Sequence, residues 1–388
     1  MKQIILLHLL IIIILTGCSN LFVSSLNQKM VASIKIGVAP GEIQIQTEET
    51  DGINEGDESD NGGNSKDGKN KDEKNKDIKK KPRWDDNALK TLTFKIAVHK
   101  NKIIAADNNF KRLQIFDDDG SLELIIGSIN TKESKEKKSY KEVNFNFNVI
   151  GSFAMDNDNN IYVQNRLVTK SSTGDSDFLP SYIIVFNKNG ELQYTMGKTG
   201  TQDIPFFYIE KLFIDSEERF FVLSRSFNSW ELIRFNNKKR EKYEDFSKLN
   251  FVETENNSTY KGAIENIEIF ESGNGVIISV AYYNDVRFKY RKLYEYSLDK
   301  SEIVREITNI DDPKNVLFNI VDDKILYFWN IEGKETKFIL FNMSGNIINN
   351  IKIDFDRNNI FSKIIHNESG TIYSYHVNDD RLKIYSWK

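Results

Sequence analysis

The fold is decided by the stretch Phe153-Ala154-Met155-Asp156, followed after four polar residues by Ile161-Tyr162-Val163 and, after an insert, by Tyr182-Ile183-Ile184-Val185-Phe186-Asn187-Lys188-Asn189-Gly190-Glu191-Leu192. Its apolar runs are separated by clusters of Asn, Asp and Gly, which favour tight hairpins. We therefore interpret residues 153–197 as four short strands joined by turns. One such sheet cannot bury both of its faces alone, so it must pack against others.

The same pattern recurs in six units along the chain. Their second strands contain Ile103-Ile104-Ala105-Ala106, Ile161-Tyr162-Val163, Phe220-Phe221-Val222-Leu223, Val276-Ile277-Ile278-Ser279, Ile325-Leu326-Tyr327-Phe328 and Ile372-Tyr373-Ser374-Tyr375. Their third strands end at the aromatic residues Phe116, Phe186, Phe235, Tyr296, Phe341 and Tyr385. Self-similarity of this kind, with about four strands per unit and no helical periodicity, is typical of a β-propeller. The sequence predicts an all-β protein, with a six-bladed propeller of four-stranded blades at residues 84–388.

The first unit contains polar residues at fixed positions in addition to its apolar strands. Asp107 and Arg112 lie five positions apart and are followed by Leu113-Gln114-Ile115-Phe116-Asp117 and Gly120. This resembles the NHL-type propeller repeat, in which Asp-x-x-Asn-x-Arg precedes an apolar strand, Phe-Asp and Gly. Phe110 stands where the family usually has Asn, and later units keep only the apolar skeleton. The resemblance covers roughly residues 94–388 and implies the same propeller fold.

The last unit ends directly after its third strand, at Trp387-Lys388. An unpaired sheet edge there would be prone to wrong pairing. Apolar residues alternate within residues 34–47, which favours a strand. We expect this segment to supply the missing fourth strand and to join the first and last blades.

The N-terminus resembles an export signal. Lys2 precedes the apolar run Ile4–Leu15, which is too short to cross a bilayer as a helix. The run ends in Leu15-Thr16-Gly17-Cys18, which is similar to the lipobox of bacterial lipoproteins. This resemblance implies a signal peptide at residues 1–17, diacylglycerol on the Cys18 thiol, and an acyl chain such as palmitate on the new amino group. The alternatives are a chance cysteine behind an ordinary signal and an uncleaved anchor.

Lipidation at Cys18 would place the protein in the bacterial cell envelope, with the membrane as its first partner. Two or more acyl chains hold a protein stably in a bilayer. Neither position after Cys18, Ser19 or Asn20, is the Asp that resembles an inner-membrane retention signal. This favours the outer membrane. The sequence leaves open whether the protein faces the periplasm or the cell surface.

Two segments between the lipobox and the propeller are too polar to form a core. We expect residues 18–33 to be a lipidated tether and residues 48–83 to be a disordered charged segment. The lysine-rich part, 66–83, is either a solvated spacer or a contact with a membrane surface or polyanion. Over the whole chain 53 Lys and Arg balance 57 Asp and Glu, so no basic field favours nucleic acid as a partner.

The long insertions predict one functional face. They occupy residues 129–148, 167–180, 249–263 and 282–291, all in connections that leave an up-and-down blade at the same end. Loops on a rigid scaffold commonly carry function. The candidate binding residues are of types common in hot spots: Tyr140, Phe145, Phe147, Phe178, Tyr260, Tyr282, Tyr283 and Arg287. Each could instead pack its own loop onto a blade.

Motifs for catalysis are weak. The loop Asp156-Asn157-Asp158-Asn159-Asn160 suggests calcium, but it lacks the Gly and Glu of an EF-hand and is better explained as a polar hairpin turn. His99 and His366 end equivalent inner strands, which makes a metal on the ring axis conceivable. We predict no catalytic residue, no metal ligand and no cofactor from the sequence.

Two functions are consistent with these patterns. The first is a lipid-anchored envelope protein whose propeller is a non-enzymatic scaffold that binds another protein through the face with the long insertions. The alternative is a metal-dependent hydrolase or lyase of the cell envelope that uses the ring axis, as six-bladed propellers can.

Overall fold

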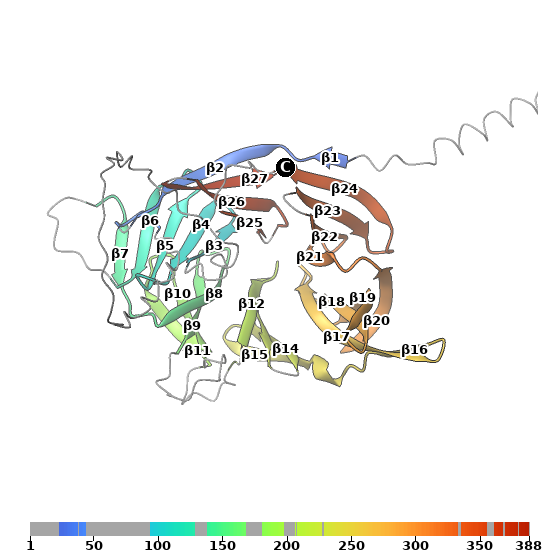
Figure 1. Ribbon diagram of the computed structural model, residues 1–388. Coiled ribbons are helices and arrows are strands. Elements are labelled where there is room, and N and C mark those ends of the chain that lie inside the picture. The colour runs from blue at the N-terminus through green and yellow to red at the C-terminus, as the bar shows by residue number, and fades with distance from the viewer. Residues whose placement is uncertain are drawn as a thin grey trace, which may run out of the picture.

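The chain forms a ring of six β-sheets, a six-bladed β-propeller, as the sequence repeats predict (Figure 1). The computed structural model describes residues 23–37, 39–43, 94–128, 138–167, 181–197, 206, 208–226, 229–332, 335–354, 361–367, 369–378 and 380–387. The predicted lipidation site, the predicted charged segment 48–83 and Phe178 lie outside these residues. Among the described residues no helix is long and apolar enough to cross a membrane.

The first three blades follow the chain in order. Blade 1 consists of β3 (Phe94–His99), β4 (Lys102–Asp107), β5 (Arg112–Asp117), β6 (Leu122–Gly127) and β7 (Lys141–Asn144). Blade 2 consists of β8 (Val149–Met155), β9 (Ile161–Arg166), β10 (Ser181–Phe186) and β11 (Leu192–Met196). Blade 3 consists of β12 (Tyr208–Ile214), β13 (Phe220–Arg225), β14 (Trp230–Asn236) and β15 (Lys239–Asp245).

The other three blades complete the ring. Blade 4 consists of β16 (Val252–Glu255), β17 (Ser258–Ile269), β18 (Gly275–Asn284), β19 (Arg287–Ser297) and β20 (Glu302–Ile310). Blade 5 contains β21 (Asn315–Val321), β22 (Ile325–Glu332), β23 (Glu335–Asn342) and β24 (Ile347–Asp354), and blade 6 contains β25 (Phe361–His366), β26 (Ile372–Asn378) and β27 (Arg381–Trp387). Each of these two blades gains an outer strand from the N-terminus.

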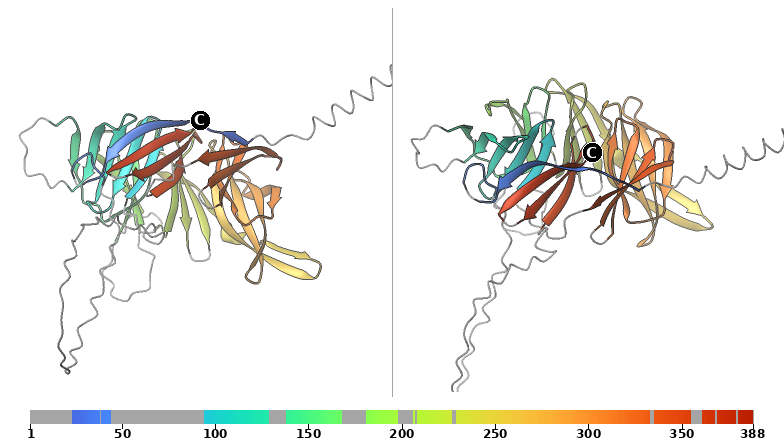
Figure 2. Two further views of the ribbon diagram at one scale, coloured as in Figure 1. Left: turned by 45° about the horizontal axis from the view of Figure 1, so that its top comes forward. Right: turned by 90° about the horizontal axis from the view of Figure 1, so that it is seen from above.

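The N-terminal strands lie along the outer edges of blades 5 and 6. β2 (Gln28–Lys35) pairs antiparallel with β27 and is the fourth strand of blade 6. β1 (Val23–Ser25) pairs parallel with β24 on blade 5. Figure 2 shows this blue segment crossing from one blade to the other, next to the C-terminus. The last blade is thus completed by a strand from the opposite end of the chain.

The bounds predicted for this segment were wrong at both ends. The closing strand is Gln28–Lys35 and not residues 34–47, and the predicted tether 18–33 contains β1 and most of β2. The strand stops at Lys35 because the chain then turns, with Gly41 in the left-handed region at φ +80°. Ile36 and Ile43 form a parallel bridge across this turn. Period-two alternation continues through the turn, so it did not mark where pairing ends.

The same turn fastens the N-terminal segment to blade 1. Glu42 offers its carbonyl oxygen to Arg112 Nη2 and to Gln114 Nε2, both at 2.8 Å. The backbone N–H of Gly41 donates to Gln114 Oε1 at 2.9 Å. Arg112 also pairs with the buried carboxylate of Asp107 at 3.3 Å. The Asp and Arg that carry the resemblance to NHL repeats therefore have a structural role, in which they hold residues 41–43 against blade 1.

Several tight turns share one hydrogen-bonding pattern. An Asp or Asn ends a strand, and its side-chain oxygen accepts the backbone N–H of the residue four positions later. The acceptors are Asp156, Asn187, Asp215, Asn342 and Asn367. Such Asx turns fix hairpin geometry locally. The predicted hairpin at Asp156-Asn160 is confirmed, because the Asp156 carboxylate also accepts the side-chain amide of Asn160 at 2.8 Å.

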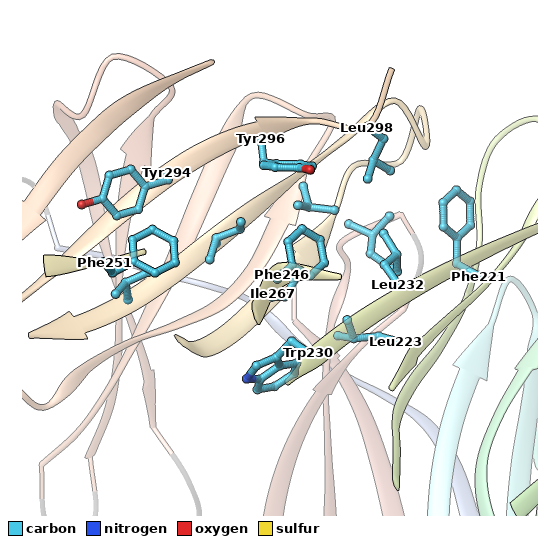
Figure 3. Close-up of a cluster of buried hydrophobic side chains, with 14 of the residues drawn as sticks. Phe221, Leu223, Trp230, Leu232, Phe246, Phe251, Ile267, Tyr294, Tyr296 and Leu298 are labelled. Atoms are coloured by element: carbon cyan, nitrogen blue, oxygen red, sulfur yellow. The ribbon is translucent and has the colours of Figure 1, made fainter. Parts of the chain in front are cut away.

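The hydrophobic core lies between neighbouring blades. Figure 3 shows the cluster between blades 3 and 4, where Trp230 and Phe246 pack with Tyr296. Phe246 belongs to η2 (Phe246–Lys248), a 3-10 helix that fills the gap between the two sheets, and its ring meets that of Tyr296 edge-on at 5.2 Å. Burial of side chains between sheets, with one cluster per pair of blades, gives a rigid frame.

The two ends of the ring differ. First and second strands are joined by short turns at one end, which we name the short-turn face. The second-to-third and blade-to-blade connections lie at the other end, where the inner strands begin; we name it the long-loop face. The four predicted insertions all attach at the long-loop face, as their neighbouring strands show.

Candidate functional site

Blade 4 projects from the long-loop face as two hairpins. β16 pairs with the first part of β17, and β18 and β19 continue as a long hairpin to Asn284 and Arg287 (Figure 1). At the tip, Asp285 has a positive φ of 53° and Val286 is 91% exposed. Val252 on β16 is also exposed, at 49%. An apolar side chain this open on a rigid hairpin is suited to contact with another molecule.

A polar network holds these hairpins. Tyr290 donates a hydrogen bond from its hydroxyl to Glu253 Oε2 at 2.5 Å, and Lys292 Nζ lies 2.6 Å from Glu253 Oε1. The hydroxyls of Tyr282 and Tyr294 are 2.6 Å apart. Burial, and then the hydrogen bond to Glu253, raises the pKa of Tyr290 well above its ordinary value. These tyrosines therefore stay neutral and keep the hairpins stiff.

The structure divides the predicted binding residues into two groups. Phe147, Tyr260 and Tyr282 are 2%, 9% and 1% exposed, so the structure shows them as buried side chains, and their binding role stays a prediction. Tyr260 on β17 and Tyr282 on β18 pack in the cluster between blades 3 and 4, and Phe147 packs in the cluster between blades 1 and 2. Phe145 is partly buried against Phe186, with ring centroids 5.1 Å apart.

The remaining predicted residues stay accessible. Tyr140 and Tyr283 are half-buried and Arg287 is exposed. Tyr283 donates to Glu265 Oε1 at 3.3 Å, and its ring meets that of Phe288 edge-on at 6.0 Å. Sequence reasoning missed Val286, although its place between Asp285 and Arg287 in the predicted insertion 282–291 was a usable signal.

A cavity of about 390 Å³ occupies the centre of the ring. All six inner strands line it, namely β3, β8, β12, β17, β21 and β25. Most of its wall is apolar, for example Ala97, Phe213 and Phe318. Its polar groups come mainly from the strand ends, such as Lys95 near the long-loop face and His99 at the short-turn face. A cavity of this size and character is typical of small-molecule sites.

The long-loop end of the cavity gathers positive charge. Lys95 is half-buried, and its charge interacts unfavourably with those of Arg166 and Lys363. Burial, and then these two cations, lowers the pKa of Lys95 to about 8, while Glu210 opposes the shift. Burial among the surrounding protein atoms lowers the pKa of Lys363 too. Lys211 is neutralised separately by Glu268 at 2.6 Å.

The two histidines considered for a metal both line the cavity. His99 ends β3, and His366 ends β25 with its Nδ1 3.1 Å from the carbonyl oxygen of Asn367. The His366 ring packs edge-on against Phe318 at 5.2 Å. Within the described residues, no three His, Cys, Asp or Glu side chains come together in a way that could hold a metal ion.

Comparisons with known proteins give only distant structural similarities. No family model matches the sequence, and no curated protein matches it. A solved structure of the Dos1 propeller is similar with a TM-score of 0.37 and 10% identity, covering 75% of this chain and 77% of that chain. A protein of unknown function from Bacteroides caccae has a TM-score of 0.35 and 12% identity, covering 66% of this chain and 80% of that chain. Neither similarity carries an argument about function.

Proposed function

We propose that the protein is a lipid-anchored component of the bacterial cell envelope whose propeller is a non-enzymatic scaffold that binds another protein through the long-loop face. The lipid would sit on Cys18 of the lipobox-like sequence and would hold the domain at a membrane, with the outer membrane favoured. The NHL-like repeats supply the scaffold in this proposal, and blade 4 supplies the contact surface.

One observation supports the binding surface above all. Val286 is 91% exposed at the tip of a hairpin that the network of Glu253, Tyr290 and Lys292 holds in place. A rigid hairpin loses little conformational entropy on binding, and an exposed aliphatic side chain gains by being covered. Arg287, next to Val286, adds a charged group of a type that is enriched in protein interfaces.

Site-specific photocrosslinking tests this proposal. A photoreactive amino acid at Val286 should give a discrete crosslinked species in living cells. The matched control is the same amino acid at Ile347, which is 48% exposed but begins β24 on the short-turn face. Crosslinking at Val286 and not at Ile347 is the expected result. No adduct at Val286, or the same adducts at both positions, would contradict the proposal.

A further inference from the structure

The central cavity has one property that protein binding by blade 4 does not use. Lys95 lines its long-loop end, and the charges of Arg166 and Lys363 are near enough to act on Lys95, with Glu210 as the carboxylate that offsets them. These residues come from β3, β9 and β25, so blades 1, 2 and 6 each contribute one cation. No hydrogen bond from any of the three cationic groups to a carboxylate occurs within the described part of the chain.

A second observation concerns the geometry of Arg166 and does not depend on any pKa. Its guanidinium lies over the ring of Tyr208 at 5.1 Å, and its Nε atom is buried without a hydrogen-bond partner among the described residues. A buried donor is normally paired, so this Nε is available to an acceptor from a ligand or water. A guanidinium presents its donors in a planar fork that fits carboxylate and phosphate.

The apolar lining and the volume of the cavity limit which ligands can fit. Ala97, Phe213 and Phe318 make the interior apolar, and the cavity volume of about 390 Å³ is that of a small-molecule site and not of a folded partner. A suitable ligand carries negative charge at one end and an apolar body at the other. The charge would meet the cations near the long-loop face, and the body would lie along the axis.

We propose that the central cavity binds a small organic oxyanion, a carboxylate or phosphate with an apolar body, through Lys95, Arg166 and Lys363. An anion there relieves the mutual repulsion of the cations and supplies acceptors for their donors. The proposal is independent of the contact at the blade 4 hairpin tip, since Val286 does not line the cavity.

Chemical labelling of Lys95 tests the site directly. An amine reagent modifies the neutral form of lysine, and burial together with Arg166 and Lys363 sets the pKa of Lys95 at about 8. Lys95 should therefore react faster than the exposed Lys300, which lies in a turn on the short-turn face. Hexanoate and hexyl phosphate should slow labelling of Lys95 at least about tenfold and leave Lys300 unchanged, whereas hexanamide and hexanol should protect neither. Labelling of Lys95 that none of the anions alters at millimolar concentration would overturn the proposal.

Calorimetry with two variants gives the second measurement. Lys95→Met and Arg166→Met should each weaken binding of the same two anions at least about tenfold, whereas Lys300→Met should bind as the unaltered protein does. Inorganic phosphate carries negative charge but has no apolar body, so it should bind more weakly than hexyl phosphate. Equal affinity for hexanoate and hexanamide, or full affinity in both cavity variants, would contradict an anion site. Crosslinking at Val286 in the Lys95→Met variant tests the scaffold proposal separately from the anion site. The crosslink should persist in this variant, because the blade 4 contact does not involve Lys95.

Discussion

Arg381 donates a hydrogen bond from Nε to the hydroxyl oxygen of Ser33 at 2.6 Å, and a second from Nη2 to the Ser33 carbonyl oxygen at 2.7 Å. The two residues are 348 positions apart in the chain and lie on paired strands, β2 and β27. This contact joins the two ends of the propeller and offers a direct test of how the ring closes.

Arg381→Ala should lower the free energy of unfolding by about 1–3 kcal/mol, because it removes two charge-assisted bonds from a partly buried site. Urea denaturation measures this loss. Arg305→Ala is the control, since Arg305 pairs with Glu295 on an exposed edge and should cost less than about 1 kcal/mol. An effect of Arg381→Ala no larger than the control would show that the contact does not stabilise closure.

Ile34→Ala tests whether β2 belongs to the core. Ile34 is 2% exposed and packs in the cluster between blades 6 and 1, so we expect a loss of about 2–5 kcal/mol. Met30→Ala on the same strand should change stability by less than about 0.5 kcal/mol, because Met30 is 54% exposed. Similar unfolding midpoints for the two variants would argue against a packed β2.

Lys95 should make stability depend on pH. Its pKa is about 8 in the folded protein and 10.5 in a free lysine, so the unfolded chain binds more protons between these values. Stability therefore rises with pH through this window. We expect Lys95→Met to be more stable by about 1–2 kcal/mol at pH 7, a figure reduced for solvent screening of a half-buried group. Thermal unfolding from pH 7 to 10 should show this difference shrinking; a difference that is constant with pH would contradict the low pKa.

Tyr282 and Tyr283 are adjacent but should behave differently. Tyr282→Ala empties a site that is 1% exposed and removes the hydroxyl contact with Tyr294, so it should cost about 3–5 kcal/mol. Tyr283→Ala should cost about 1 kcal/mol or less, because its ring is half-buried. Chemical denaturation separates the two. Equal losses would mean that Tyr282 is not the packing residue.

Cys18→Ser tests the lipid anchor. Cells that express the unaltered protein should incorporate a clickable fatty acid into it and retain it in the membrane fraction. The variant should lose both label and membrane retention, because Cys18 is the only cysteine in the chain. Label that persists in Cys18→Ser would contradict the lipobox proposal.

The propeller could be predicted because each blade repeats a local pattern. Apolar second strands and Asn or Asp turns recur with enough regularity that Asp156 and Asn187 mark turns without any long-range information. The limits of the closing strand could not be predicted in this way. Whether Lys35 or Ile45 ends the strand depends on the partner β27 and on the turn at Gly41, and neither is visible in local alternation.

The candidate sites were less predictable for a related reason. An aromatic residue in an insertion has the same local pattern whether it packs inward, as Tyr282 does, or stays accessible, as Tyr283 does. The cavity cations were missed because Lys95, Arg166 and Lys363 lie on separate blades and meet only when the ring closes. Lys95 did carry a signal, as a lysine between the apolar residues Phe94 and Ile96 of an inner strand.

The crossing of β1 and β2 over blades 5 and 6 also sets an order of events in synthesis. Both strands are made well before β27, the partner of β2. Blade 6 therefore cannot be completed while the chain is still emerging, and β2 must wait unpaired until residue 387 is available. A chain that is exported before it folds would meet this requirement without delay, because both ends would reach the far side of the membrane before the ring had to close.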